Sequence, residues 1–134
     1  MDALEAVPTG LSKRPPTVLI VENDFLVRWR AAEYLRERNF TVIEANDALD
    51  AIGLLASDVR VDIVVSDARL SYELKQIGLI EWFKRHHPQV PLLVTSSDPA
   101  ECTQVADNEK RRFIAKPYEL AELHSHIESM LNRP

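Results

Sequence analysis

The sequence predicts an α/β domain built on a doubly wound, five-stranded parallel sheet with about five helices. Three observations lead to this prediction. Short β-branched runs alternate with longer amphipathic ones, the short runs are apolar nearly throughout, and 46% of the 134 residues are hydrophobic. Strands that are apolar on both faces are typical of a parallel sheet covered by helices on both sides. The length suits one domain with a single core.

Five short runs have the length and composition of strands. They are "TVLIV" at 17–21, "FTVIEA" at 40–45, "VDIVVS" at 61–66, "VPLLVTS" at 90–96 and "RFIAK" at 112–116. The opening "MDALEAVPTGLSKRPP" mixes Pro, Gly and charge without a sustained period. Residues 1–16 are therefore expected to form a flexible N-terminal segment, and residues 17–134 the folded domain.

Helical periodicity fills the intervals between these runs. The predicted helices lie within 24–38, 48–57, 74–87, a weaker and more polar stretch at 99–110, and 118–131. In the first helix Val27, Ala31 and Leu35 share one face, and Trp29 falls outside it. An aromatic residue off the core face can mark a partner surface. A homodimer through this helix is one hypothesis, which a monomeric mass at high concentration would contradict.

Composition excludes several classes of protein. The formal net charge of -5 argues against a direct nucleic-acid-binding surface, which is normally basic. Cys102 is the single cysteine and cannot form an internal disulfide. No long apolar span or leader sequence is present, so no membrane partner is expected and the cytoplasm is the expected location. The "KRR" at 110–112 is interpreted as a solvated turn.

Acids, a hydroxyl and an ammonium follow the predicted strands. The strand ends carry Glu22, Asn23 and Asp24, then Ser66 and Asp67, then Thr95 and Ser96, then Lys116. Chemistry in open parallel sheets lies beyond the carboxyl ends of the strands, where the strand order reverses. Oxygen ligands from the first and third strands can hold Mg²⁺ there. Asp67 can then accept a phosphoryl group as a nucleophile, with Lys116 neutralising charge and Thr95 donating a hydrogen bond.

In this order the motifs resemble the receiver domains of bacterial two-component response regulators. "VLIVEND" resembles the strand and acidic pair of that family, "DIVVSD" its phosphoacceptor strand, "LLVTS" its Thr or Ser strand, and "FIAKP" its Lys-Pro ending. The resemblance runs from about Thr17 to about Leu131. It implies a flavodoxin-like fold and a signalling module rather than an enzyme. It also implies phosphorylation of Asp67 by a histidine kinase or phosphotransfer protein, and a downstream protein target.

The resemblance also implies roles for individual residues. Mg²⁺ would be held by Glu22, Asn23, Asp67 and the backbone carbonyl of Arg69. Thr95 and Phe113 match the switch positions of the family, and the Lys116–Pro117 bond is expected to be cis. Each position also has a simpler interpretation. Asp67 can be a loop carboxylate, Thr95 a buried hydroxyl bonded to backbone, and Phe113 only a core residue.

Three departures from the family pattern stand out. Asn23 occupies the position where the family usually has an Asp ligand, so metal affinity should fall unless Asp24 reaches the site. Either residue can instead cap the first helix, and both roles are compatible. The segment after Asp67 lacks the usual Met-Pro, and its glycine comes late, at Gly78. A mobile or reshaped loop over 70–78 is expected. The step before the fifth strand lacks the usual Gly-Ala.

Two other functions stay open at this point. The first is a receiver-like protein-binding module with weak or no phosphorylation, motivated by Asn23 and the altered loop. The second is a small phosphatase with the same acid and Mg²⁺ chemistry. A phosphatase would need a second catalytic acid shortly after Asp67, where Arg69 stands.

Overall fold

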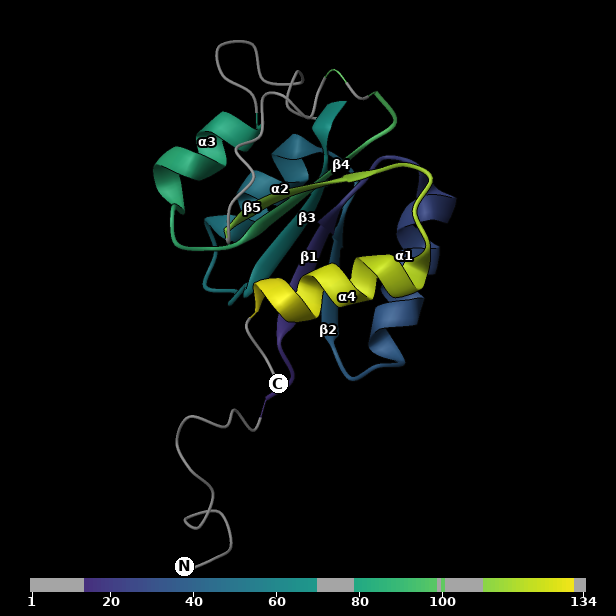
Figure 1. The fold of residues 1–134 in the computed structure, drawn as a ribbon. Helices are drawn as coiled ribbons and strands as arrows, with labels where there is room; N and C mark the ends of the chain where they lie inside the picture. The colour runs from purple at the N-terminus through teal and green to yellow at the C-terminus, as the bar shows by residue number, and fades with distance from the viewer. Residues whose placement is uncertain (1–13, 70–78, 99, 101–109, 132–134) are drawn as a thin grey trace, which may run out of the picture.

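The computed structural model describes residues 14–69, 79–98, 100 and 110–131. Their strands form one sheet in the order β2-β1-β3-β4-β5, and every neighbouring pair is parallel (Figure 1). The strands are β1 (Thr17–Val21), β2 (Thr41–Ala45), β3 (Ile63–Asp67), β4 (Leu92–Ser96) and β5 (Arg111–Ala115). The predicted fold class is confirmed.

Four α-helices lie within the described residues. They are α1 (Phe25–Arg36), α2 (Ala48–Leu55), α3 (Leu79–His86) and α4 (Leu120–Met130). Helices α1 and α4 cover one face of the sheet, and α2 and α3 cover the other (Figure 1). The weaker helix predicted at 99–110, and the loop predicted to be reshaped at 70–78, lie outside the described residues. None of the helices in the described part of the chain is long and apolar enough to cross a membrane.

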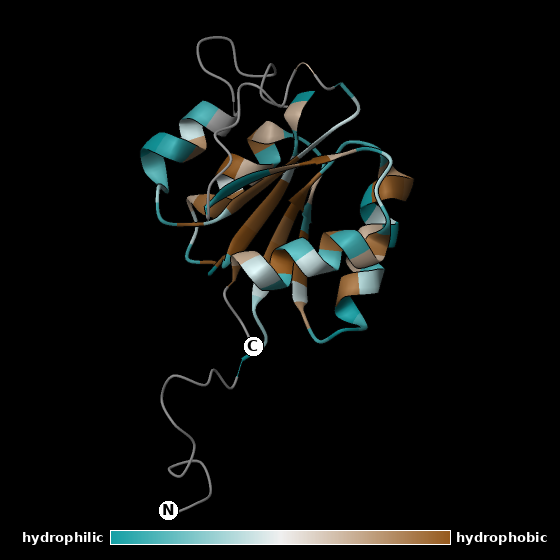
Figure 2. Ribbon diagram, in the orientation of Figure 1, coloured by the Kyte–Doolittle hydropathy of each residue, from teal (hydrophilic) through white to brown (hydrophobic). Residues whose placement is uncertain are grey.

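The apolar strands feed two separate cores, one on each face of the sheet. In β1, Val18 and Ile20 pack with α1 and α4, whereas Leu19 and Val21 pack with α2 and α3. Successive side chains of a strand point to opposite faces, so a strand covered on both sides must be apolar throughout. The hydrophobic strands at the centre of Figure 2 show this continuous pattern.

The start of β5 corrects one sequence interpretation. Residues 110–112 were expected to form a solvated turn, but β5 begins at Arg111, whose exposure is only 7%. Its guanidinium donates hydrogen bonds to the carbonyls of Val90, at 3.1 Å, and Pro88, at 3.3 Å, in the connection between α3 and β4. It also donates to the carbonyl of Lys110, at 2.8 Å. Buried in this way, the cation ties the entry of β5 to the chain entering β4.

Helix α1 exposes an apolar patch at its N-terminal end. Phe25, Leu26 and Trp29 have exposures of 64%, 56% and 46%. The prediction that Trp29 lies off the core face is confirmed, because the residues of α1 that are buried are Ala31, Ala32 and Leu35.

The strand order places the chemistry. The chain passes from β1 outward to β2 and then crosses back to β3 on the other side of β1. The order therefore reverses between β1 and β3, and a crevice is expected beyond the carboxyl ends of these two strands. Glu22 follows β1 and Asp67 ends β3.

Candidate functional site

Lys116 joins two buried carboxylates that are far apart in the sequence. Its Nζ donates to Oε1 of Glu22 at 2.6 Å and to Oδ2 of Asp67 at 2.7 Å. Glu22 and Asp67 have exposures of 3% and 1%. The carboxyl ends of β1 and β3 bring the acids together, and the end of β5 supplies the ammonium. The structure thus unites three of the predicted site residues.

Arg69 makes a second set of contacts with Asp67. Its backbone N–H donates to Oδ1 at 2.8 Å, Nη2 donates to Oδ2 at 2.9 Å, and Nε lies at a longer 3.4 Å from Oδ1. From the sequence, only the backbone carbonyl of Arg69 was predicted as a site atom. The guanidinium contact is an addition, although a cation two residues after a strand-ending acid is a signal that could have indicated it.

The two cations set the protonation state of the carboxylate. Burial raises the pKa of Asp67, but hydrogen bonds from Arg69 and Lys116 outweigh it and hold this pKa below its ordinary value of 3.8. Burial likewise lowers the pKa of Lys116, but bonds and charges from Asp67 and Glu22 raise it above 10.5. At neutral pH Asp67 is therefore an anion and Lys116 a cation, which is the state that a carboxylate nucleophile needs.

Thr95 lies beside Asp67 on the neighbouring strand. The register of β3 and β4 pairs these two residues directly, and Thr95 is 2% exposed. The next residue of β4, Ser96, accepts the backbone N–H of Lys116 at 2.8 Å. Phe113 is half-buried against the core on the α2 and α3 face. The sheet register thus brings Thr95 to the edge of the site, while the switch roles of Thr95 and Phe113 stay predictions.

The three residues that follow β1 have different contacts. Asp24 is the N-cap of α1, and its Oδ1 accepts the N–H groups of Leu26 at 3.0 Å and Val27 at 3.1 Å. The capping role expected for this loop is confirmed for Asp24. Oε2 of Glu22 accepts the N–H of Asp24 at 3.0 Å, whereas Asn23 is exposed. Oδ1 of Asp24 is therefore directed to the start of α1, and a role of Asp24 at the metal site stays a prediction.

Arg28 holds this loop in place from the first turn of α1. Its Nη1 donates to the carbonyl of Glu22 at 2.7 Å and to Oδ1 of Asn46 at 3.2 Å. Its Nε pairs with Oε1 of Glu44 at 3.1 Å. One side chain therefore links the end of β1 to the end of β2, which limits the positions available to Glu22.

A cavity opens beside Lys116. It has a volume of about 410 Å³ and is lined by Val27, Arg30, Ser97, Lys116, Pro117, Tyr118 and Leu120. The Lys116–Pro117 bond is cis, as expected. Burial raises the pKa of Tyr118 to about 12, with help from the negative charges of Glu22 and Asp67. The cavity wall beside the site is therefore uncharged at Tyr118 at neutral pH.

Comparison with known families decides what this site belongs to. Residues 18–128 match the family model of the response regulator receiver domain. The chain belongs to this family. The receiver domain is 29% identical over 120 residues to the sensor kinase CckA of Brucella abortus, a match covering 87% of this chain and 13% of that protein. It is 28% identical to the response regulator MprA of Mycolicibacterium vanbaalenii, covering 89% of this chain and 52% of MprA.

Solved structures agree with this assignment. A signal receiver domain of an HD domain-containing protein from Pseudomonas fluorescens has a TM-score of 0.73 and 26% identity, covering 89% of this chain and 96% of that one. A response regulator receiver protein from Sinorhizobium medicae has a TM-score of 0.76 at 22% identity, which shows the shared fold, and covers 90% of this chain and 98% of that one. The receiver domain spans about half the length of MprA and far less of CckA.

Receiver domains generally bind Mg²⁺ for phosphorylation, and the donor set here fits such an ion. Mg²⁺ is usually held by one or two carboxylates and keeps several waters. Glu22 and Asp67 supply two carboxylates at one edge of the sheet. Among the described residues, no group of three or more His, Cys, Asp or Glu could hold a metal ion. Two carboxylates with water completing the coordination would be a donor set of the kind that Mg²⁺ usually takes.

Proposed function

We propose that this receiver domain accepts a phosphoryl group on Asp67 from a histidine kinase or phosphotransfer protein, in a Mg²⁺-dependent way. The observation that supports it is the buried Asp67 carboxylate, in contact with Lys116 at the topological switch of the sheet. Receiver domains generally interact with such kinases and phosphotransfer proteins. We place the domain in the cytoplasm, where these partners present their phosphohistidines.

The chemistry requires a nucleophile and a way to neutralise charge. One oxygen of Asp67 forms a bond to phosphorus, while the bond from phosphorus to the donor's imidazole nitrogen breaks and that nitrogen keeps the electron pair. Lys116 holds a positive charge beside the new acyl phosphate. Bound Mg²⁺, held by Glu22, Asp67, the Asn23 amide and the Arg69 carbonyl, would supply further positive charge to the phosphoryl oxygens.

The phosphorylated state would be read by nearby residues. Thr95 would donate a hydroxyl hydrogen bond to the phosphoryl group, and its pairing with Asp67 in the strand register supports this role. A movement of Thr95 and Phe113 would then alter the surface that a downstream protein target binds. Both movements follow from a two-state domain whose equilibrium the phosphoryl group shifts.

A direct test uses a small acyl-phosphate donor. The wild-type domain, incubated with Mg²⁺ and acetyl phosphate, is expected to gain the mass of one phosphoryl group, and the gain should be lost on alkaline treatment. Asp67→Asn should show no gain because its amide is not a nucleophile. The matched control is Asp58→Asn, which changes an exposed acid in the turn after α2 and should retain the gain. A folded wild type that gains no mass would favour the protein-binding module instead.

Asn23 sets a second expected result. Asn23→Asp should tighten Mg²⁺ binding by roughly tenfold, because a second charged oxygen from the β1 loop joins a site with two buried acids. Calorimetric titration with Mg²⁺ measures the dissociation constant. Asn39→Asp, an exposed change at the end of α1, serves as the control and should leave the constant unaltered. Equal affinity for wild type and Asn23→Asp would remove Asn23 from the metal site.

A further inference from the structure

We propose that the guanidinium of Arg69 is a resident counterion of Asp67 that competes with the divalent cation, so that metal binding requires the Arg69 side chain to leave the carboxylate. This inference rests on the proposed function, since it concerns the same carboxylate. It goes further because it assigns a role to the side chain of Arg69, whereas the proposed function uses only the backbone carbonyl of this residue.

The contacts show how fully the carboxylate is occupied. Oδ2 of Asp67 accepts from Nη2 of Arg69 at 2.9 Å and from Nζ of Lys116 at 2.7 Å. Oδ1 accepts from the backbone N–H of Arg69 at 2.8 Å, with Nε of the same residue at 3.4 Å. Each oxygen has two lone pairs. An incoming ion or phosphorus atom must therefore displace one of these donors.

The charges at the site already balance. Glu22 and Asp67 provide two negative charges, and Lys116 and Arg69 provide two positive ones, all joined by ion pairs. Asn23 adds no charge to this set. A divalent ion that entered with both cations in place would give the site a net positive charge. An acid at position 23 would have restored part of the negative charge, so the amide and the Arg69 pair both act against the metal.

The exposure of the two side chains indicates which cation, Lys116 or Arg69, leaves Asp67 when the metal binds. The side chain of Lys116 is 16% exposed and contacts both carboxylates, whereas the side chain of Arg69 is 60% exposed and reaches Asp67 from the solvent side. Because most of the Arg69 side chain already faces solvent, its guanidinium can be hydrated when it leaves Asp67, while Lys116 still pairs with the carboxylate. Lys116 would leave two buried anions behind. Arg69 is therefore the exchangeable partner.

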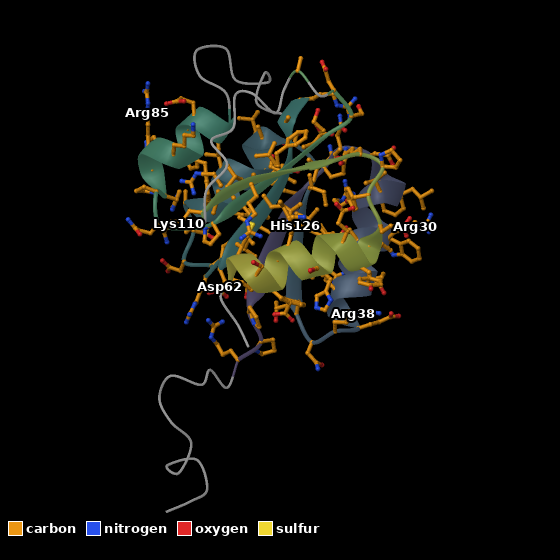
Figure 3. The ribbon with its side chains drawn as sticks, viewed as in Figure 1. Arg30, Arg38, Asp62, Arg85, Lys110 and His126 are labelled. Carbon is orange, nitrogen blue, oxygen red and sulfur yellow. The ribbon has the colours of Figure 1, made fainter. Side chains whose placement is uncertain are left out.

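The test is a calorimetric titration of the domain with Mg²⁺, with no phosphodonor present. Arg69→Gln removes the charge and keeps a polar side chain, and it should bind Mg²⁺ about three- to tenfold more tightly than wild type. Arg85→Gln is the matched control, because the side chain of Arg85 is 61% exposed and also pairs with an acid. Arg85 projects from α3, on the opposite side of the domain from Arg30, which lines the cavity beside Lys116 (Figure 3). Arg85→Gln should leave the affinity unchanged.

A second background shows whether the effect acts through the carboxylate. In Asp67→Asn, the gain caused by Arg69→Gln should shrink to less than half, because the competed charge is absent. A wild type with no detectable binding and an Arg69→Gln variant with clear binding would support the proposal. Equal affinity for wild type and Arg69→Gln, or no binding by either, would overturn it. Phosphorylation of Asp67 measured by mass stands or fails separately from this affinity difference.

Discussion

Lys116→Met is expected to destabilise the fold by about 2–4 kcal/mol at neutral pH, because it leaves Glu22 and Asp67 buried without the cation that joins them. The methionine fills similar space, so the loss reports charge rather than volume. The same variant should lose most of the acetyl phosphate mass gain, since no ammonium remains to neutralise the acyl phosphate. Urea unfolding at neutral pH measures the stability change, and Lys84→Met on α3, half-buried and also cationic, should cost less than about 0.5 kcal/mol.

The pH dependence of this loss has a definite sign. The pKa of Asp67 is lowered, so its contribution to stability is present above its ordinary pKa and is lost as pH falls through the folded value. The pKa of Lys116 is raised, so its contribution is present below its ordinary pKa and is lost as pH rises through the folded value. Wild type should therefore keep both contributions from about pH 5 to about pH 9.

Without Lys116, the two neighbouring carboxylates repel each other, and proton uptake at lower pH relieves the repulsion. The stability difference between wild type and Lys116→Met should therefore be smaller at about pH 5 than at about pH 7.5. A difference that stays constant with pH would show that Lys116 acts by packing alone, and a difference that grows as the pH falls would contradict the repulsion between the two carboxylates.

Arg111→Met is expected to cost about 1.5–3 kcal/mol of unfolding free energy. The change removes the donors that bind the carbonyls of Pro88, Val90 and Lys110, while keeping an apolar stem of similar length. Chemical unfolding followed by circular dichroism measures it. Phosphorylation of Asp67 should persist in the folded fraction, because Arg111 starts β5 and the site lies at its other end.

Arg112→Met is the matched control for this prediction. Arg112 is the next residue of β5, points to the opposite face of the sheet and is only half-buried. Its replacement should change the unfolding free energy by less than about 0.5 kcal/mol. Similar losses for both variants would mean that net charge, rather than the carbonyl contacts of Arg111, supports the entry of β5.

The sheet and the meeting of Glu22, Asp67 and Lys116 could be predicted from sequence because both depend on order along the chain. Alternating strand and helix patterns imply parallel strands, and the carboxyl ends of parallel strands meet at one edge. Any polar residue that follows such a strand is carried to that edge. The position of Thr95 at this edge could be predicted for the same reason, and the register of β3 and β4 then pairs it with Asp67.

The side-chain contacts of Arg69 and Arg111 do not follow from strand order, although the position of Arg69 two residues after Asp67 is a signal for the first of them. A run such as "KRR" is normally solvated, and the carbonyls that make Arg111 a buried residue come from the α3–β4 connection, more than 20 residues earlier. The guanidinium of Arg69 depends on a rotamer that its sequence position does not determine. Both cases depend on where a long, flexible side chain finds its acceptors, which is decided by the packed fold.

The loop after β1 gives its three successive polar residues different duties. Glu22 meets the ammonium of Lys116, Asp24 starts α1, and Asn23 faces solvent between them. Under the metal role proposed for Asn23, a substitution at position 23 would change ion binding without removing the cap of α1. Related domains could therefore carry either an amide or an acid at position 23. The two versions would differ in their affinity for Mg²⁺, while the helix cap and the sheet around the site stay the same.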